Sequence, residues 1–307
     1  KKLNIILNEI KIPAIKLHLN KISSSHFLPK LSRFINKKFY HLGVGSSINR
    51  YDNTITFYSS FADKKNYSSY TKNEKFLNFG SGAFFHNKWK NYDYPGQTPY
   101  YRNIQGKKNK DFFEIDLCDE NLNITESDNS ITLIYCSHTL EHLDQQSSKR
   151  FLKECYRILK KNGIIRLALP NTKNDFNLVR CLNSQSSVNE NVKKNYILDA
   201  TFHLLADTGK LDFHSIIELL NQSNFESHLF YKNVIKKFPE MAVFDANKPE
   251  RHISYWDYDN LIEVTKDIGF NYIIPSYQGS SVASPFCNIH VFDNTGPHNT
   301  FCADIIK

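Results

Sequence analysis

The fold is decided by residues 131–170, which read ITLIYCSHTL EHLDQQSSKR FLKECYRILK KNGIIRLALP. The run 131–136 is apolar and rich in β-branched residues, as expected of a strand buried on both faces. Apolar residues then recur at helical spacing, at Phe151, Leu152, Cys155, Ile158 and Leu159. A second apolar run, 164–169, is closed by Pro170. Strand, helix and strand in this order predict two parallel strands joined by a right-handed crossover.

Two helices have recognisable ends. Asp144 can cap the helix of this unit, and the basic residues and glycine at 160–163 are typical of a helix stop. Asp257 can cap a later helix that we expect to end at Gly269. Both helices are predicted to pack on the sheet.

Short strand candidates lie on either side of this unit. They occupy 75–79, 89–93, 112–115, 271–275 and 300–306. The alternation predicts an α/β fold with a doubly wound, Rossmann-like, mostly parallel sheet and an antiparallel closing strand. One spacing conflicts with it, because only six residues separate Gly82 from Trp89 and a parallel crossover usually needs a dozen or more. Either the crossover helix is abbreviated or the strand 89–93 is misplaced.

The chain is predicted to have two parts. Residues 1–72 follow neither period cleanly and form an N-terminal accessory segment, although Thr54–Tyr58 alternates like a half-buried strand. Residues 73–307 form the main domain, which a polar helical insertion interrupts at about 172–250. Within the insertion, residues 213–220 have a helical pattern.

Composition excludes several classes of protein. With 307 residues and 40% hydrophobic residues, the chain can bury a sizeable core, so wholesale disorder is excluded. The net charge of +8 would suit an anionic partner, but the excess is scattered lysine whose densest run is 107–110. This favours a solvated surface over a nucleic-acid track. No stretch approaches the roughly 20 apolar residues of a membrane span.

The cysteines carry no metal-binding or disulfide signature. They stand at Cys118, Cys136, Cys155, Cys181, Cys287 and Cys302, without a CxxC pair or regular spacing. Several lie in apolar runs. We therefore predict reduced, mostly buried thiols in a cytoplasmic protein, and no metal site.

Glycines and polar side chains follow four predicted strands. In an open parallel sheet, ligands bind beyond the carboxyl ends of the strands. Gly80-Ser81-Gly82 lets a backbone approach a ligand, and Asp93 and Asp116 can accept hydrogen bonds from ribose hydroxyls or an adenine amine. The fourth strand runs into Ser137-His138. Each feature alone is a weak signal, but their shared order predicts one ligand site.

Several short motifs between residues 75 and 171 follow one rhythm. They are Leu77-Asn78-Phe-Gly80-Ser-Gly82, Trp89-Lys-Asn91-Tyr-Asp93, Asp116, Ser137-His138-Thr-Leu140-Glu141-His142, Phe151-Leu-Lys-Glu154, Arg157-Ile-Leu159-Lys160, Asn162-Gly163 and Arg166-Leu-Ala168-Leu-Pro170. Over about a hundred residues this rhythm resembles the class I S-adenosylmethionine-dependent methyltransferases, in their type 11-like branch. The resemblance implies the fold and the cofactor S-adenosyl-L-methionine, and it says nothing about the substrate.

The resemblance also implies a cofactor site. Its residues would be Asn78, Gly80, Ser81, Gly82, Asp93, Asp116, Leu117 and Ser137. Asp93 would hold the ribose hydroxyls, while Asp116 and Leu117 would frame the adenine. The chain departs from the family pattern twice: Asn78 stands where many relatives have an acid, and Ala83 replaces a third glycine.

His138 and His142 are the candidate catalytic bases, because an unperturbed imidazole titrates near neutrality. They are four residues apart and would share one face of a helix. For each, the alternative is a structural histidine that caps the turn after the strand. His252 is a weaker third candidate.

The preferred function is methyl transfer to a hydroxyl or amine of a small molecule or glycan precursor, without a nucleic-acid partner. Bacterial relatives with this rhythm are often associated with sugar and surface-polysaccharide pathways. One alternative is a non-catalytic partner or regulatory subunit with the same fold, which Asn78 and Ala83 leave open. An RNA methyltransferase is a more distant alternative. The oligomeric state is left open. The insertion, which follows a strand, is expected to form a lid or wall over the acceptor site.

A second Gly-x-Gly loop stands at Gly43-Val-Gly45. Asp93 and Asp116 follow Gly82 at predicted strand ends, whereas no such series follows Gly45. The loop at 80–82 is therefore the predicted cofactor loop. Gly82→Val is expected to abolish cofactor binding, and Gly45→Val to leave affinity within a few-fold.

Overall fold

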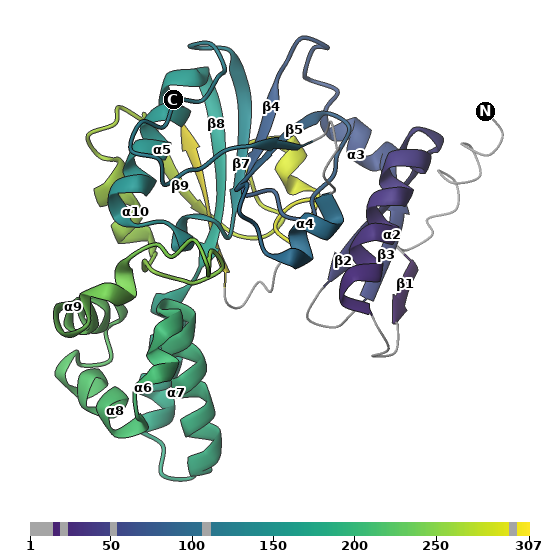
Figure 1. Cartoon of the computed structure of the whole chain (residues 1–307). Helices are drawn as coiled ribbons and strands as arrows, with labels where there is room; N and C mark the ends of the chain where they lie inside the picture. Colours follow the sequence, from purple (N-terminus) through teal and green to yellow (C-terminus); the bar gives the residue numbers. More distant parts are fainter. Residues whose placement is uncertain (1–14, 19–23, 50–53, 106–111, 295–299) are drawn as a thin grey trace.

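The computed structural model describes residues 15–18, 24–49, 54–105, 112–294 and 300–307 (Figure 1). The lysine-rich run at 107–110 therefore lies outside the described residues. Among those described, no helix is both long and apolar enough to cross a membrane.

A seven-stranded sheet forms the centre of the molecule. In chain order its strands are β4 (Phe76–Phe79), β5 (Trp89–Asp93), β6 (Phe112–Glu114), β7 (Ile131–Ser137), β8 (Leu159–Pro170), β9 (Tyr272–Ser276) and β10 (Thr300–Ile306). Their spatial order is β6-β5-β4-β7-β8-β10-β9, and only β10 runs in the direction opposite to the other six strands. The predicted doubly wound sheet with an antiparallel closing strand is confirmed. Because the chain winds from β4 out to β6 and then returns to β7, the topological switch point lies between β4 and β7.

The unit that decides the fold contains β7, the 3₁₀ turn η2 (Leu140–His142), α5 (Gln145–Ile158) and β8. The predicted cap is confirmed, since Asp144 accepts the backbone N–H of Ser147 at 2.9 Å. The predicted stop at 160–163 is wrong: α5 ends at Ile158. Leu159 is already extended, fully buried and paired with Ile131, so sheet pairing replaces the last helical turn.

Asp144→Ala should lower the free energy of unfolding by about 1 kcal/mol, because two bonds to Ser147 are lost at the first turn of α5. Urea denaturation of the full chain measures the change. The matched control is Asp267→Ala, which removes an exposed carboxylate 3.6 Å from Lys149 and should change stability by less than about 0.5 kcal/mol. Equal effects of the two substitutions would contradict the capping role.

The crossover between β4 and β5 contains no helix. Residues 80–88 form only turns and bends, and the strand at 89–93 is in register with β4. The strand was therefore placed correctly, and the crossover helix is absent rather than abbreviated. An aromatic cluster takes the place of the helix on one face of the sheet. In this cluster the ring of Tyr135, from β7, packs against the rings of Phe286 and Phe292. These rings come from far along the chain and cover the sheet where a crossover helix would lie.

The opposite face of the sheet is covered by helices. Leu77 and Ile134 contribute to a core cluster that also contains residues of α5 and of α10 (Tyr258–Thr265). Asp257 caps α10 as predicted and accepts the N–H of Asn260 at 2.7 Å. Residues 266–269 continue as turns, so the helix is shorter than expected.

The N-terminal segment forms its own antiparallel sheet beside the main one (Figure 1). Its elements are β1 (Ile15–His18), α2 (Ser24–Phe39), η1 (Tyr40–Leu42), β2 (Val44–Asn49), β3 (Thr54–Ser59) and α3 (Ser60–Asn66). β3 confirms the strand predicted at 54–58. The segment is joined to the main domain by a buried contact of 2.6 Å between Asp63 and His86 and by Arg33, which donates to Ile104 O at 3.1 Å.

Most of residues 172–250 are helical and extend beyond the carboxyl ends of the strands (Figure 1). The elements are α6 (Thr172–Asn183), α7 (Glu190–Leu204), η3 (Ala206–Lys210), α8 (Phe213–Gln222), α9 (Ser227–Lys237) and η4 (Pro239–Ala242). They share a separate apolar core that includes Phe176 and Phe230. α8 confirms the helix predicted at 213–220.

Candidate functional site

A cavity of about 660 Å³ lies at the carboxyl ends of the parallel strands. All ten predicted site residues line it: Asn78, Gly80, Ser81, Gly82, Asp93, Asp116, Leu117, Ser137, His138 and His142. They come from the ends of β4, β5, β6 and β7, on both sides of the switch point. The sheet therefore brings together residues that are up to 64 positions apart in the sequence.

The loop after β4 presents backbone rather than side chains to the cavity. Gly80 and Gly82 have φ angles of +63° and +52°, which favour glycine. A Cβ on Gly80 would lie 1.9 Å from Oγ1 of Thr139, so this loop packs closely on the turn after β7. The buried Oγ of Ser81 has no hydrogen-bond partner among the described residues. A backbone cradle with an unpaired hydroxyl is suited to a polar ligand.

Asp93 is buried, and both of its carboxylate oxygens accept hydrogen bonds. Oδ2 accepts the N–H of Gly82 and the amide of Gln105, each at 2.7 Å, while Oδ1 accepts the N–H of Tyr94 at 2.8 Å and the amide of Gln97. Burial raises the pKa of Asp93 despite these bonds. A carboxylate offers about four acceptor sites, so a ligand hydroxyl would replace one of the two glutamine amides.

Those two glutamines were missed by the sequence analysis. Gln97 precedes α4 (Pro99–Gln105), and Gln105 is its last residue. No spacing rule marks them, because their role depends on how α4 lies against Asp93.

The remaining cofactor candidates are held in the loops and the core. The buried amide of Asn78 donates to Oδ1 of Asn91 at 3.2 Å. Asp116 is partly exposed and accepts the N–H of Cys118 at 2.8 Å, and Leu117 is buried in the main core. The Asp116 turn thus presents a carboxylate and an apolar side chain side by side.

The two predicted bases do not share a helix face. His138 has a φ of +48° and precedes η2, so the chain there is not helical. Its Nδ1 lies 3.1 Å from Oε1 of Glu141, and its Nε2 lies 3.1 Å from Oγ1 of Thr300. His142 instead donates from Nδ1 to the carbonyl of Arg251 at 3.0 Å. The expectation of a common helical face is therefore wrong.

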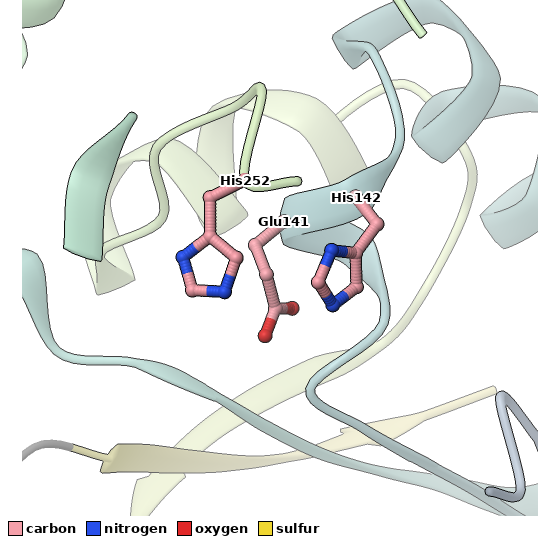
Figure 2. A group of neighbouring side chains, drawn as sticks. All are labelled: Glu141, His142 and His252. Atoms are coloured by element: carbon pink, nitrogen blue, oxygen red, sulfur yellow. The ribbon is translucent and has the colours of Figure 1, made fainter. Parts of the chain in front are cut away.

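Glu141 lies between His142 and His252 at the same end of the cavity (Figure 2). Burial of the Glu141 carboxyl acts to raise its pKa. The neighbouring histidines, of which His138 has the largest effect, outweigh burial and lower the pKa to about 2. Burial lowers the pKa of His252 to about 4, so this ring is neutral near pH 7. One ligand atom from each of Glu141, His142 and His252 lies within 4.8 Å of the other two, a spacing from which a metal ion could be bound.

The sequence analysis did not single out Glu141. It stands in the motif Ser137-His138-Thr-Leu140-Glu141-His142, between two histidines. That position could have marked it as a candidate site residue. Its partner His252 is more than a hundred residues further along the chain. Only the fold places the two together.

The N-terminal segment also forms part of the wall. Ser46, Ile48 and Tyr58 line the cavity, and the ring of Tyr58 stacks on that of His290 at 5.2 Å. Gly45 is paired with Tyr58 in the sheet, and a Cβ there would lie 2.5 Å from the tyrosine ring. Gly45→Val would therefore displace a residue of the cavity wall, so the expectation of an unchanged affinity does not hold.

Residues 98–167 match the family model of a methyltransferase domain. This match confirms the resemblance predicted from the motifs, and with it methyl transfer as the class of reaction and S-adenosylmethionine as the cofactor. No curated protein is significantly similar to the chain.

Solved structures with low similarity include three S-adenosylmethionine-dependent methyltransferases. One from Thermotoga maritima is 12% identical over 80% of this chain and 88% of its own, with a TM-score of 0.37. One from Archaeoglobus fulgidus is 13% identical over 80% and 90%, with a TM-score of 0.39. One from Methanosarcina mazei is 11% identical over 77% and 92%, with a TM-score of 0.35. At these values they carry no argument about function.

Proposed function

Starting from a methyltransferase domain, we propose that the chain transfers a methyl group from S-adenosylmethionine to a hydroxyl or amine of a small molecule or glycan precursor. The observation that carries the proposal is the single cavity that joins the glycine loop, the two strand-end aspartates and the Ser137-His138 turn. A cytoplasmic location belongs to the same proposal and is supported by six cysteines that are all free thiols.

The residues of the cavity fit the cofactor. The loop of Gly80, Ser81 and Gly82 lines the cavity, and its backbone at φ angles of +63° and +52° would contact the methionine part. Asp93 would accept hydrogen bonds from the ribose hydroxyls, and Asp116 with Leu117 would frame the adenine. When bound, the cofactor supplies a methyl group activated by a positively charged sulfur.

His138 is suited to accept a proton from the acceptor. Glu141 beside Nδ1 favours the tautomer with the proton on that atom, which leaves Nε2 as the basic nitrogen. An acceptor hydroxyl would take the place that Thr300 occupies next to Nε2. General base catalysis of this kind contributes about 10²–10⁴-fold, and alignment of the reactants contributes several kcal/mol more.

The acceptor would enter between the N-terminal segment and the end of the insertion. Phe244 and Glu250 of the insertion line the cavity, and so do Tyr58 of the N-terminal segment and His290, which stacks on it. We infer that residues 172–250 form a wall over the acceptor and that both segments select it. The accessory segment would then be part of the site.

The first test is calorimetric. The full chain should bind S-adenosylhomocysteine, and Asp93→Ala should weaken binding by about 5–30-fold, or about 1–2 kcal/mol, because the ribose loses a buried charged acceptor. The matched control, Asp119→Ala, alters an exposed carboxylate of a nearby turn and should leave affinity unchanged. A wild-type chain that binds neither the cofactor nor its product would refute the proposal.

The second measurement is turnover with a labelled methyl donor and a panel of hydroxyl and amine acceptors. Methylation of panel members supports the proposed acceptor class. Binding without turnover across the panel would favour the non-catalytic subunit, and methylation confined to RNA would favour the RNA enzyme.

A further inference from the structure

We propose that Glu141, His142 and His252 bind a divalent transition-metal ion at the acceptor end of the cavity. Binding of the ion is independent of the proposed methyl transfer, whereas its catalytic role rests on that function. The three side chains converge from two segments, the η2 turn and the stretch before α10 (Figure 2). All three line the cavity, so an ion among them would be in reach of a substrate.

Both histidines are oriented as metal ligands usually are. Nδ1–H of His142 donates to the carbonyl of Arg251 at 3.0 Å, and Nδ1–H of His252 donates to the carbonyl of His203 at 2.5 Å. Because a carbonyl can only accept, each Nδ1 carries the proton and each Nε2 has a free lone pair. Metal-bound histidines typically donate their other ring N–H to such an outer acceptor, which fixes the ring.

Glu141 supplies the independent sign of a missing partner. The side chain is 1% exposed, and neither carboxylate oxygen has a well-aligned hydrogen bond from the described residues. Nδ1 of His138 lies 3.1 Å from Oε1, the same contact that favours the proton on that nitrogen, and Oε2 has no hydrogen-bond partner among the described residues. A buried carboxylate without such bonds is costly, and a cation between it and two imidazoles would compensate it.

The backbone around these ligands is rigidly joined. The N–H groups of Ile253 and Ser254 donate to the carbonyl of Glu141 at 2.8 and 3.2 Å. The hydroxyl of Ser254 also donates to the carbonyl of Leu140 at 3.0 Å. These bonds fix the segment of His252 against η2, so only small side-chain rotations are needed to shorten the 4.8 Å spread to bonding geometry.

The donor set indicates the kind of ion and substrate. Two imidazole nitrogens and one carboxylate oxygen suit Zn²⁺, Mn²⁺, Fe²⁺ or Co²⁺ better than Ca²⁺ or Mg²⁺, which prefer oxygen. Three protein ligands leave positions open. A hydroxyl bound there would lose its proton more readily, because the ion acts as a Lewis acid. The site therefore favours a hydroxyl acceptor, or one with two adjacent oxygens, over an amine.

Co²⁺ titration of the chelator-stripped full chain tests the site by its visible absorption. We expect one equivalent to bind with a spectrum of nitrogen and oxygen ligands. Binding to the exposed Cys181 or Cys287 would instead add thiolate charge-transfer bands in the near ultraviolet. Glu141→Gln and His252→Asn should each weaken Co²⁺ binding by roughly 100-fold or more. In His252→Asn, the side-chain amide keeps an N–H donor near the position of Nδ1, but no atom takes the place of Nε2. The matched control, His214→Asn, removes an exposed histidine and should bind like the wild type.

Absence of Co²⁺ binding by the wild type, thiolate bands as the main signal, or wild-type affinity for Co²⁺ in a folded variant would overturn the metal site. Thermal denaturation shows whether each variant is folded, and either folded variant alone decides the question. S-adenosylhomocysteine binding, measured by calorimetry without metal, separates the two proposals. Binding of the product without Co²⁺ binding refutes only the metal site, whereas Co²⁺ binding without product binding refutes only the proposed methyl transfer.

Discussion

Replacing Arg166 with methionine should lower the free energy of unfolding by about 3–5 kcal/mol. The guanidinium is fully buried between two carboxylates. It donates to Oδ2 of Asp293 at 2.6 and 2.9 Å, to Oδ1 of Asp304 at 3.0 Å, to the carbonyl of Tyr277 at 3.0 Å and to the hydroxyl of Ser276. Methionine fills much of the volume but leaves two buried carboxylates without their cation.

The loss of the Arg166 guanidinium should also disturb the wall of the cavity. The N–H of Asp293 donates to the hydroxyl of Tyr135 at 2.8 Å, and Tyr135 lines the cavity together with Val291 and Asn294. Arg166 thus fixes one wall of the site through Asp293. We expect product affinity to fall as well as stability.

Lys173→Met is the matched control for Arg166→Met. Lys173 and Asp259 form an ion pair at 3.0 Å, but their side chains are 52% and 75% exposed. Such pairs contribute roughly 0–1 kcal/mol. Urea denaturation of the two variants measures both changes. A loss below about 1 kcal/mol for Arg166→Met would show that the buried network is not stabilising.

Local sequence patterns were sufficient for much of the fold. Strands such as 131–136 are mostly apolar, rich in β-branched residues and flanked by turn residues, so their number and order follow from the sequence. Asp144 and Asp257 were predicted as caps because capping involves residues only three apart. The cofactor candidates were found for a related reason, since each stands directly after a strand.

Contacts between distant segments could not be predicted in this way. The short spacing after Gly82 left two alternatives open, and it could not show that the rings of Phe286 and Phe292 cover the face of the sheet where a crossover helix would lie. Tyr58 lines the cavity although the N-terminal segment was read as accessory. Glu141 and His252 are neighbours only because the backbone of 253–254 pairs with η2. Each of these features depends on packing between segments far apart in sequence.

Gly82→Val should abolish measurable binding of S-adenosylhomocysteine, a loss of more than about 1,000-fold or 4 kcal/mol. Gly82 lines the cavity at a φ of +52°, and a Cβ there would lie 3.1 Å from the ring of Tyr101. A β-branched side chain would fill the space between that ring and the cavity, where we place the cofactor. It would also disturb the N–H that binds Asp93 at 2.7 Å.

The valine should nevertheless leave the protein folded. A non-glycine residue in the left-handed region costs about 1–2 kcal/mol, which is less than the 5–15 kcal/mol by which domains are usually stable. Gly82→Ala should show a smaller loss of affinity, because alanine has the strain but not the branched side chain. It remains informative if the valine variant unfolds.

Gly209→Val replaces Gly45→Val as the control. A Cβ on Gly209 meets only Phe202, at 3.9 Å, and Gly209 lies in η3 and does not line the cavity. We expect its affinity to stay within a few-fold of the wild type. Calorimetry measures affinity and thermal denaturation verifies folding. If folded Gly82→Val bound the product like Gly209→Val, the cofactor could not lie on the loop after β4, because no ligand there could tolerate a branched side chain at residue 82.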